Sequence, residues 1–278
     1  MRQRTPRSAI SALVLVIILV VSLGYIFRGP LRDWWDELRK PELPVPVTLR
    51  TANLNTGNTN NVNKEVTDSE NENSTVGNDT IAELPATANL NLSFTPQAPH
   101  ANWEAPFKEA CEETAALMVQ SYWSGDAIDN PDEAETRILE IVDHQNKEYG
   151  FYEDSTAEET ARFIRDLWGY ETDVYTGSEV SAEKIRREVA NGFPVIVLAA
   201  GRQLGNPNYT PPGPLYHALV VKGYLKNGQF ITHDPGTRNG EDYLYDEDVF
   251  MDAIHDWNGG DVANGQKAIV VVRGAREE

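Results

Sequence analysis

The stretch Pro96–Trp123 reads PQAPHANWEAPFKEACEETAALMVQSYW and contains the only cysteine of the chain, Cys111. Its first half is irregular and interrupted by prolines, whereas its second half carries apolar residues on one broad helical face. Those residues are Ala115, Ala116, Met118, Val119 and Tyr122. The pattern predicts a helix from about Cys111 to Trp123, with the thiol at its N-terminus.

The chemistry of Cys111 depends on what surrounds it. The free N–H groups and the dipole of a helix N-terminus stabilise a thiolate and so lower the thiol pKa. Glu112 and Glu113 follow directly, and their charges would oppose a thiolate. A lone free cysteine is also commonly a small buried hydrophobic residue. By itself Cys111 is therefore compatible with a reactive and with an inert thiol.

Two candidate partners for the thiol lie on strands expected later in the chain. His217 begins an apolar run directly after the Gly/Pro/Asn-rich loop Gly201–Pro214, and Asp234 ends the next apolar run before Pro-Gly. Either residue could instead be a satisfied polar side chain or a turn former. A thiol nucleophile needs a base that takes and returns its proton and a carboxylate that orients the base. Cys111, His217 and Asp234 meet that need, and together they predict hydrolysis by a thiol nucleophile.

The turn between the two strands determines whether Asp234 can reach His217. If Leu225–Gly228 forms a four-residue loop, Asp234 is a same-face diagonal neighbour of His217, within side-chain reach. If the turn is only Asn227–Gly228, Asp234 lies too far along the strand. His233 points to the other face in both registers.

An oxyanion donor is also required. Gln97 is the candidate upstream of the thiol, together with the backbone N–H of Cys111. The alternative for Gln97 is a surface glutamine in an irregular segment.

The rest of the pattern places helices before strands. Further helices are expected over Asp132–Tyr149, from the capping-box pattern at Thr156 to about Trp168, over Ser181–Asn191 and over Phe250–Trp257. Strands are expected over Pro194–Ala200, Tyr216–Tyr224, Gln229–Asp234 and Lys267–Arg273. This order predicts an α+β fold with a helical N-terminal lobe and an antiparallel-sheet C-terminal lobe.

Residues 94–278 resemble the papain-like cysteine peptidases and, within them, the peptidase family thirty-nine-like domains, relatives of bacteriocin double-glycine leader peptidases. The matching pieces are Gln97 with Pro99, the Cys111 helix, Tyr216-His217 with the following strand and Gly223-Tyr224, and Asp234-Pro235-Gly236-Thr237. The resemblance implies a papain-like two-lobed domain with Cys111 as nucleophile, His217 as base, Asp234 as orienting residue and Gln97 as oxyanion donor. The sequence departs from the family where Glu112-Glu113 replaces the common Gly-Pro and where Gln97 lies fourteen residues before Cys111.

The N-terminal region indicates attachment to a membrane. Residues 8–27, SAISALVLVIILVVSLGYIF, contain no charged side chain, and twenty residues of helix span ~30 Å, enough to cross a bilayer core. They predict an uncleaved signal anchor after a cytoplasmic tail of residues 1–7, with a cleaved export signal as the alternative. Arginines flank the run on both sides, so the count of positive charges hardly favours one orientation in the membrane over the other. The long acidic C-terminal part favours an orientation at the cell membrane in which this part is extracytoplasmic.

Residues 28–93 are expected to form a juxtamembrane segment and a linker. The Asn/Thr-rich part is of low complexity, and TANLN occurs twice, at Thr51–Asn55 and Thr87–Asn91. Such a composition cannot bury enough apolar surface to fold, so a disordered linker is predicted. The folded domain is therefore expected to span residues 94–278.

Composition excludes several classes of function. A net charge of −19 argues against nucleic-acid binding, and one cysteine excludes an intrachain disulfide framework and a multi-thiolate zinc site. The histidines have no metal-ligand spacing, so no metal or organic cofactor is expected, and nothing in the sequence indicates an oligomeric state. The expected partner is a peptide or protein substrate. Three alternatives remain: a non-catalytic peptide-binding relative, a surface interaction module with a structural Cys111, and a cell-wall peptide amidase.

Overall fold

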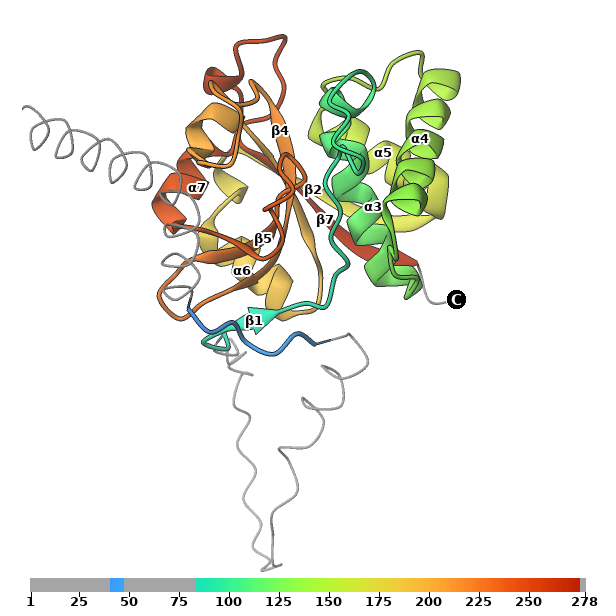
Figure 1. The fold of residues 1–278 in the computed structure, drawn as a ribbon. Helices are drawn as coiled ribbons and strands as arrows, with labels where there is room; N and C mark the ends of the chain where they lie inside the picture. Colours follow the sequence, from blue (N-terminus) through green and yellow to red (C-terminus); the bar gives the residue numbers. More distant parts are fainter. Residues whose placement is uncertain (1–40, 48–83, 276–278) are drawn as a thin grey trace, which may run out of the picture. The chain divides into compact units, whose positions relative to one another are not determined.

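The computed structural model describes residues 41–47 and 84–275 (Figure 1). From Pro44 onward these residues belong to one compact unit. The predicted signal anchor, residues 8–27, and most of the predicted linker lie outside the described residues. Within the described ranges, no helix combines the length and apolarity needed to span a membrane.

An antiparallel sheet forms the centre of the domain, with the strand order β2-β7-β3-β4-β5-β6. A short strand, β1, pairs with the end of β4. The strands are β1 (Ala88–Asn89), β2 (Tyr170–Thr176), β3 (Val195–Ala199), β4 (His217–Tyr224), β5 (Phe230–His233), β6 (Tyr243–Tyr245) and β7 (Ala268–Ala275). Every residue of β3 and β4 is buried, so these two strands lie at the centre of the core.

Helices cover both faces of this sheet. They are α3 (Cys111–Ser124), α4 (Pro131–Glu148), α5 (Ala157–Trp168), α6 (Ala182–Ala190) and α7 (Glu247–Ala253). The first three lie together on one side of the sheet, and α6 and α7 lie on the other (Figure 1). The expected α+β class, with helices and an antiparallel sheet, is thus confirmed.

Local side chains set the starts of most helices. Thr156 accepts from the Glu159 N–H while Glu159 accepts from the Thr156 N–H, which is the predicted capping box. Ser181 caps α6 by accepting from the Lys184 N–H, without the reciprocal bond of a capping box. The predicted helices that become α5 and α6 therefore begin within about a residue of their expected positions. Helix α3 begins at Cys111 as expected, although no side chain caps it.

Three expectations differ from the structure. Strands β2 and β6 were not expected, and β2 is half-buried along its whole length because it forms an edge of the sheet. Helix α7 begins three residues before the expected start at Phe250 and ends at Ala253 rather than at Trp257. Strand β2 is polar and strand β6 is short, so neither has the apolar alternation that marks a strand in a sequence.

The packed chain also extends N-terminal to residue 94, where the sequence places the start of the domain. The second TANLN copy contains β1, and Leu90 and Leu92 beyond it are buried. Leu90 donates its N–H to the Lys222 carbonyl, and Val47 forms a parallel bridge with Leu90. Sheet pairing thus orders a polar segment that could not fold alone.

Candidate active site

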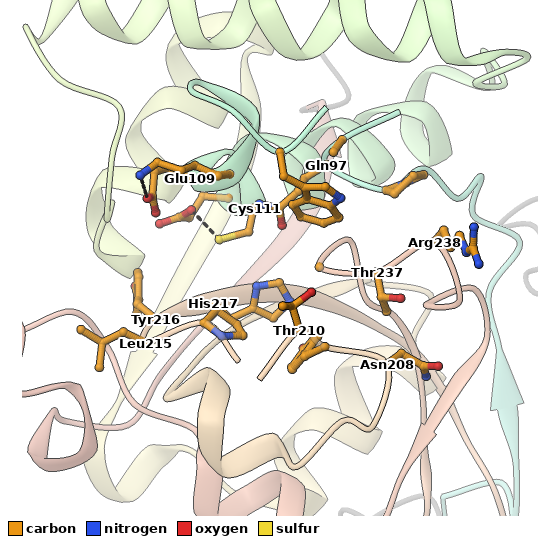
Figure 2. A pocket seen from close by; sticks show the side chains of 18 of the residues that line it. Gln97, Glu109, Cys111, Asn208, Thr210, Leu215, Tyr216, His217, Thr237 and Arg238 are labelled. Carbon is orange, nitrogen blue, oxygen red and sulfur yellow. Dashed lines mark hydrogen bonds and ion pairs between the residues drawn. The ribbon is translucent and has the colours of Figure 1, made fainter. Parts of the chain in front are cut away.

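A cleft of about 700 Å³ separates the helical side of the domain from the start of β4. Gln97 and Cys111 lie on one wall, and His217 lies on the other (Figure 2). Trp103 and Leu215 are apolar side chains on the cleft, and both are exposed. The cleft therefore brings together three of the four residues selected from the sequence and offers apolar surface beside them.

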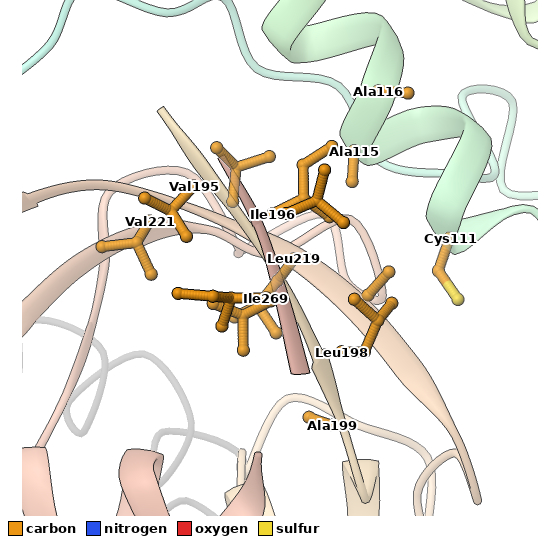
Figure 3. Close-up of a cluster of buried hydrophobic side chains, with 14 of the residues drawn as sticks. Cys111, Ala115, Ala116, Val195, Ile196, Leu198, Ala199, Leu219, Val221 and Ile269 are labelled. Carbon is orange, nitrogen blue, oxygen red and sulfur yellow. The ribbon is translucent and has the colours of Figure 1, made fainter. Parts of the chain in front are cut away.

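Helix α3 carries Cys111 to the cleft. Ala115 and Ala116, one turn further on, are fully buried in the core, so small side chains let the helix approach β4 and β7 closely (Figure 3). Cys111 projects from the end of this packed helix and is 6% exposed. The first N–H groups of a helix have no acceptor within it, so the Cys111 backbone N–H is available at the cleft.

The thiol contacts both walls. Cys111 Sγ donates to Glu112 Oε2 over 3.0 Å. From the other wall, the backbone N–H of Ala218, the residue after His217, donates to the sulfur and lowers its pKa. Burial, followed by the charge of Glu112 and its hydrogen bond, outweighs that donor and raises the Cys111 pKa well above its ordinary value. The conflict between the acidic first turn and a thiolate is therefore real, and Glu112 is its main side-chain cause.

Glu112 is itself an unusual residue. It is fully buried, and burial followed by the charge of Glu113 raises its pKa well above the ordinary carboxyl value. Its Oε2 accepts from the thiol, but its Oε1 has no hydrogen-bond partner within residues 41–47 and 84–275. Glu113 points elsewhere and accepts from Gln145 Nε2. Of the two consecutive glutamates, Glu112 thus contacts the thiol and Glu113 contacts α4 through Gln145.

His217 is the first residue of β4 and is 1% exposed. Its Nε2 lies 2.8 Å from Asp234 Oδ1, which leaves Nδ1 as the nitrogen that is free to face the cleft. A Cβ on Gly236 would lie 2.8 Å from His217 Cε1, so a glycine there makes room for the imidazole ring. Asp234 and Gly236 together fix the position of the ring.

Asp234 is fully buried behind His217 and does not line the cleft. Its Oδ2 accepts from the hydroxyls of Tyr209 and Tyr245, both over 2.6 Å, and from Asn206 Nδ2 over 3.0 Å. Burial alone would raise the pKa of Asp234, but the His217 charge and the hydrogen bonds reverse this and lower it to about 2. The carboxylate therefore remains charged and can orient the histidine.

A β-bulge determines the register that brings these two residues together. Tyr224 pairs with Phe230, so the connection is one residue longer than the four-residue loop considered from the sequence. The pairing then shifts between Val221 and Gly223, because Lys222 is an extra residue in β4. Beyond this bulge, β4 and β5 pair in the register that a four-residue loop would give. Val220 consequently opposes His233, and Asp234 follows next to the start of β4.

Gln97 is buried and lines the cleft. Its Nε2 donates one hydrogen bond to the Phe107 carbonyl over 2.8 Å, which leaves the second amide hydrogen for another acceptor. Its backbone N–H donates to the Pro235 carbonyl, directly after Asp234. Gln97 is therefore held between both walls and is no surface glutamine, despite its distance from Cys111 in the sequence.

Three residues of the site were not selected from the sequence. Asn206 and Tyr209 lie in the Gly/Pro/Asn-rich loop Gly201–Pro214, from which no site residue was selected, and Tyr245 lies in the unexpected strand β6. Nothing local identifies them as partners of Asp234. The part of the chain described here also contains no group of three or more His, Cys, Asp or Glu residues arranged to hold a metal ion.

Comparisons with known proteins bear on the same region. Among solved structures, the chain is similar to a protein of Bacillus anthracis described as a C39-like peptidase, with 15% identity and a TM-score of 0.43, over 69% of this chain and 98% of that one. It is also similar to a prointerpain A fragment of Prevotella intermedia, with 14% identity and a TM-score of 0.44, over 83% and 81% of the two chains. No curated protein matches the chain.

The family comparison is more specific. The model of the Peptidase_C39 like family matches residues 89–259, which is more than half of the chain. The match includes Gln97, Cys111, His217 and Asp234. The chain therefore belongs to the Peptidase_C39 like family and is a cysteine peptidase-like hydrolase.

Proposed function

We propose that this chain hydrolyses a peptide or amide bond through a thioester formed on Cys111, with His217 as base and Asp234 as the residue that orients it. The observation that carries this proposal is the cleft itself. Cys111 and His217 face it from opposite walls, and Asp234 binds the far nitrogen of His217 over 2.8 Å. These positions match the needs of a thiol nucleophile and its base.

The reaction begins when His217 Nδ1 takes the thiol proton and the sulfur attacks the substrate carbonyl carbon. The carbonyl π electrons move to oxygen, and the resulting oxyanion accepts from the second amide hydrogen of Gln97 and from the Cys111 N–H. The C–N bond then breaks, and the leaving amine receives the proton from His217. Water, deprotonated by His217, attacks the thioester, which releases the carboxylic acid and returns the proton to the sulfur.

A peptide-binding protein without turnover is the second candidate, because one contact in the site favours it. Glu112 accepts the thiol hydrogen, and burial together with Glu112 raises the thiol pKa. A thiol held in this way reacts slowly unless the substrate or a proton on Glu112 weakens its hold. The two candidates differ in whether the thiol becomes a nucleophile when the cleft is occupied.

A peptidyl acyloxymethyl ketone, a probe that alkylates an activated active-site thiol, distinguishes the two candidates. We expect stoichiometric labelling of the full chain by intact mass, no labelling of Cys111→Ser, and labelling of His217→Ala slowed at least about 100-fold. Equal labelling rates for the full chain and His217→Ala would leave only the binding function. Hydrolysis of a peptide pool by the same three proteins checks turnover directly.

We also propose that residues 8–27 anchor the chain in the cell membrane as a single pass, with the hydrolase domain extracytoplasmic. The support is the uncharged run of twenty residues and the acidic sequence that follows it. The full chain should remain with membranes after carbonate extraction, and protease added outside intact cells should remove the domain. A carbonate-soluble chain would contradict the anchor.

A further inference from the structure

The cleft carries two carboxyl groups that have no cationic partner. Glu112 Oε1 is completely buried at the cleft and lacks a hydrogen-bond partner within the described residues. Asp154 lines the same cleft, is half-buried, and forms no ion pair or hydrogen bond with any described residue. Burial of carboxyl groups without a partner is costly, so such groups point to a ligand that supplies the missing donor.

The two carboxyl groups lie at the same end of the cleft. The charge of Asp154 acts on Glu112, and Tyr216, next to His217, donates its hydroxyl to the carbonyl of Ser155, the neighbour of Asp154. Glu109, Leu215 and Tyr216 lie on one side of Cys111, whereas Gln97, Thr237 and Arg238 lie on the other (Figure 2). The acidic end is thus directly adjacent to the reacting thiol.

Nearby charged groups do not neutralise this end. Lys108 lines the cleft, but its Nζ is paired with Glu109 over 3.1 Å. Asp256 is close to Tyr216 but is already satisfied by the Tyr216 hydroxyl and by the N–H groups of Ala157 and Trp257. Glu112 and Asp154 remain as the carboxyl groups available to a ligand.

We infer that Glu112 and Asp154 form a subsite for a cationic group of the substrate, either a Lys or Arg side chain or a free amino terminus, next to the scissile bond. Leu215 and Trp257 line the same cleft and provide apolar surface for the methylene stem of such a side chain. This inference rests on the proposed function for its position relative to the scissile bond. The binding preference itself does not depend on turnover.

The test separates binding from catalysis. Hexapeptide amides with one lysine moved along an alanine background are compared with the same series carrying norleucine, and each peptide is used with a free and an acetylated N-terminus. Affinity is measured by calorimetry on full-chain Cys111→Ala, and kcat/KM is measured on the unmodified chain. At one lysine position, or at the free amino terminus, we expect about tenfold tighter binding than for the neutral analogue.

Asp154→Asn is the diagnostic variant. Asp154 has a positive φ of 54°, a conformation that asparagine also tolerates, so the backbone should be preserved. The variant should remove the preference for the cationic peptide and leave affinity for the norleucine peptide unchanged. Glu153→Gln changes the exposed neighbouring carboxyl, which is outside the cleft, and should keep the preference.

Each outcome is decisive. Preference in binding without any cleavage supports the subsite and contradicts the proposed hydrolysis. Equal affinity for lysine, norleucine, free and acetylated peptides overturns the subsite, whether or not the chain cleaves them. A uniform loss of affinity in Asp154→Asn also overturns it, because Asp154 would then act only on the structure.

Discussion

The carboxylate of Asp234 owes its position to donors from several segments of the chain. Tyr209 and Asn206 come from the loop before β4, Tyr245 comes from β6, and the Gly236 N–H comes from the turn after β5. A buried carboxylate with this many donors resists protonation and rotation. The orientation of His217 is thus determined by residues that never touch the cleft thiol.

Replacing Tyr245 with Phe tests this arrangement. The variant removes the 2.6 Å hydrogen bond to Asp234 Oδ2, so the pKa of Asp234 should rise from about 2 and the free energy of unfolding should fall by about 1–2 kcal/mol. Hydrolytic activity should fall as well, because the imidazole loses part of its support. Tyr243→Phe, on the same strand but without a bond to Asp234, is the control. Equal effects of both variants in urea unfolding and in turnover would contradict the argument.

Burial of Glu113 makes the stability of the fold depend on pH. It is fully buried, and burial raises its pKa to about 8 against the opposing hydrogen bonds from its own backbone and from Gln145. The folded state therefore binds this proton more tightly than the unfolded state, whose pKa is about 4.5, so stability falls as the pH rises from about 4.5 to 8. The charged form carries the penalty.

Glu113→Gln should remove that penalty, because the Gln oxygen can still accept from Gln145 Nε2. The melting temperature of the variant should exceed that of the parent chain at pH 8, and the difference should shrink at pH 5. Thermal unfolding at the two pH values measures this, with the exposed Glu148→Gln as control. A difference that is independent of pH would be inconsistent with a raised Glu113 pKa.

At the scale of elements, the bulge at Lys222 affects the pairing of β4 on both of its sides. It aligns His217 with Asp234 on the β5 side, and it places Gly223 against β1 on the other side. A Cβ on Gly223 would lie 2.5 Å from the Ala88 carbonyl oxygen and 2.8 Å from Ile231 Cδ1. The N-terminal segment can pair with β4 only because residue 223 has no side chain.

Gly223→Ala should therefore displace β1 and lower the free energy of unfolding by about 1–3 kcal/mol. The Leu90 N–H, which donates to the Lys222 carbonyl, should exchange with deuterium faster in the variant, while amides in the middle of β3 should keep their protection. Unchanged exchange at Leu90 would mean that β1 accommodates the methyl group without moving.

At the scale of the whole molecule, His233 joins three segments. Its Nε2 donates to the Leu92 carbonyl, and its Nδ1 accepts from the Asp242 N–H. The second bond requires the neutral ring, because Nδ1 accepts a hydrogen bond only when it carries no proton. Burial, assisted by the charge of Lys222, lowers the pKa of His233 to about 4.

This residue should make the fold sensitive to acid. The folded pKa lies below the unfolded value of about 6.5, so the unfolded state binds more protons and stability is lost as the pH falls from about 6.5 to 4. Between pH 7 and pH 5 the loss assigned to His233 is about 2 kcal/mol. His233→Asn should show a correspondingly smaller loss in urea unfolding, whereas the surface variant His100→Asn should behave like the parent chain.

Local chemistry explains which elements could be predicted. The capping box at Thr156, the cap at Ser181 and the apolar runs of β3 and β4 depend on side chains within a few residues of one another, so they can be read from the sequence. Strand β6 and helix α7 have weak local patterns, and tertiary packing determines their bounds. The same difference separates the residues of the site that were selected from those that were missed.

The sequence by itself determined the α+β class, the helix that begins at Cys111, and Cys111, His217, Asp234 and Gln97 as residues that could act together. The tertiary structure alone decided that a bulge at Lys222 aligns Asp234 with His217, and that Glu112 contacts the buried thiol. The reason is physical: a helix start or an apolar strand is set by neighbours along the chain. Register, burial and the pKa values that follow from them are set by groups that meet only when distant segments pack.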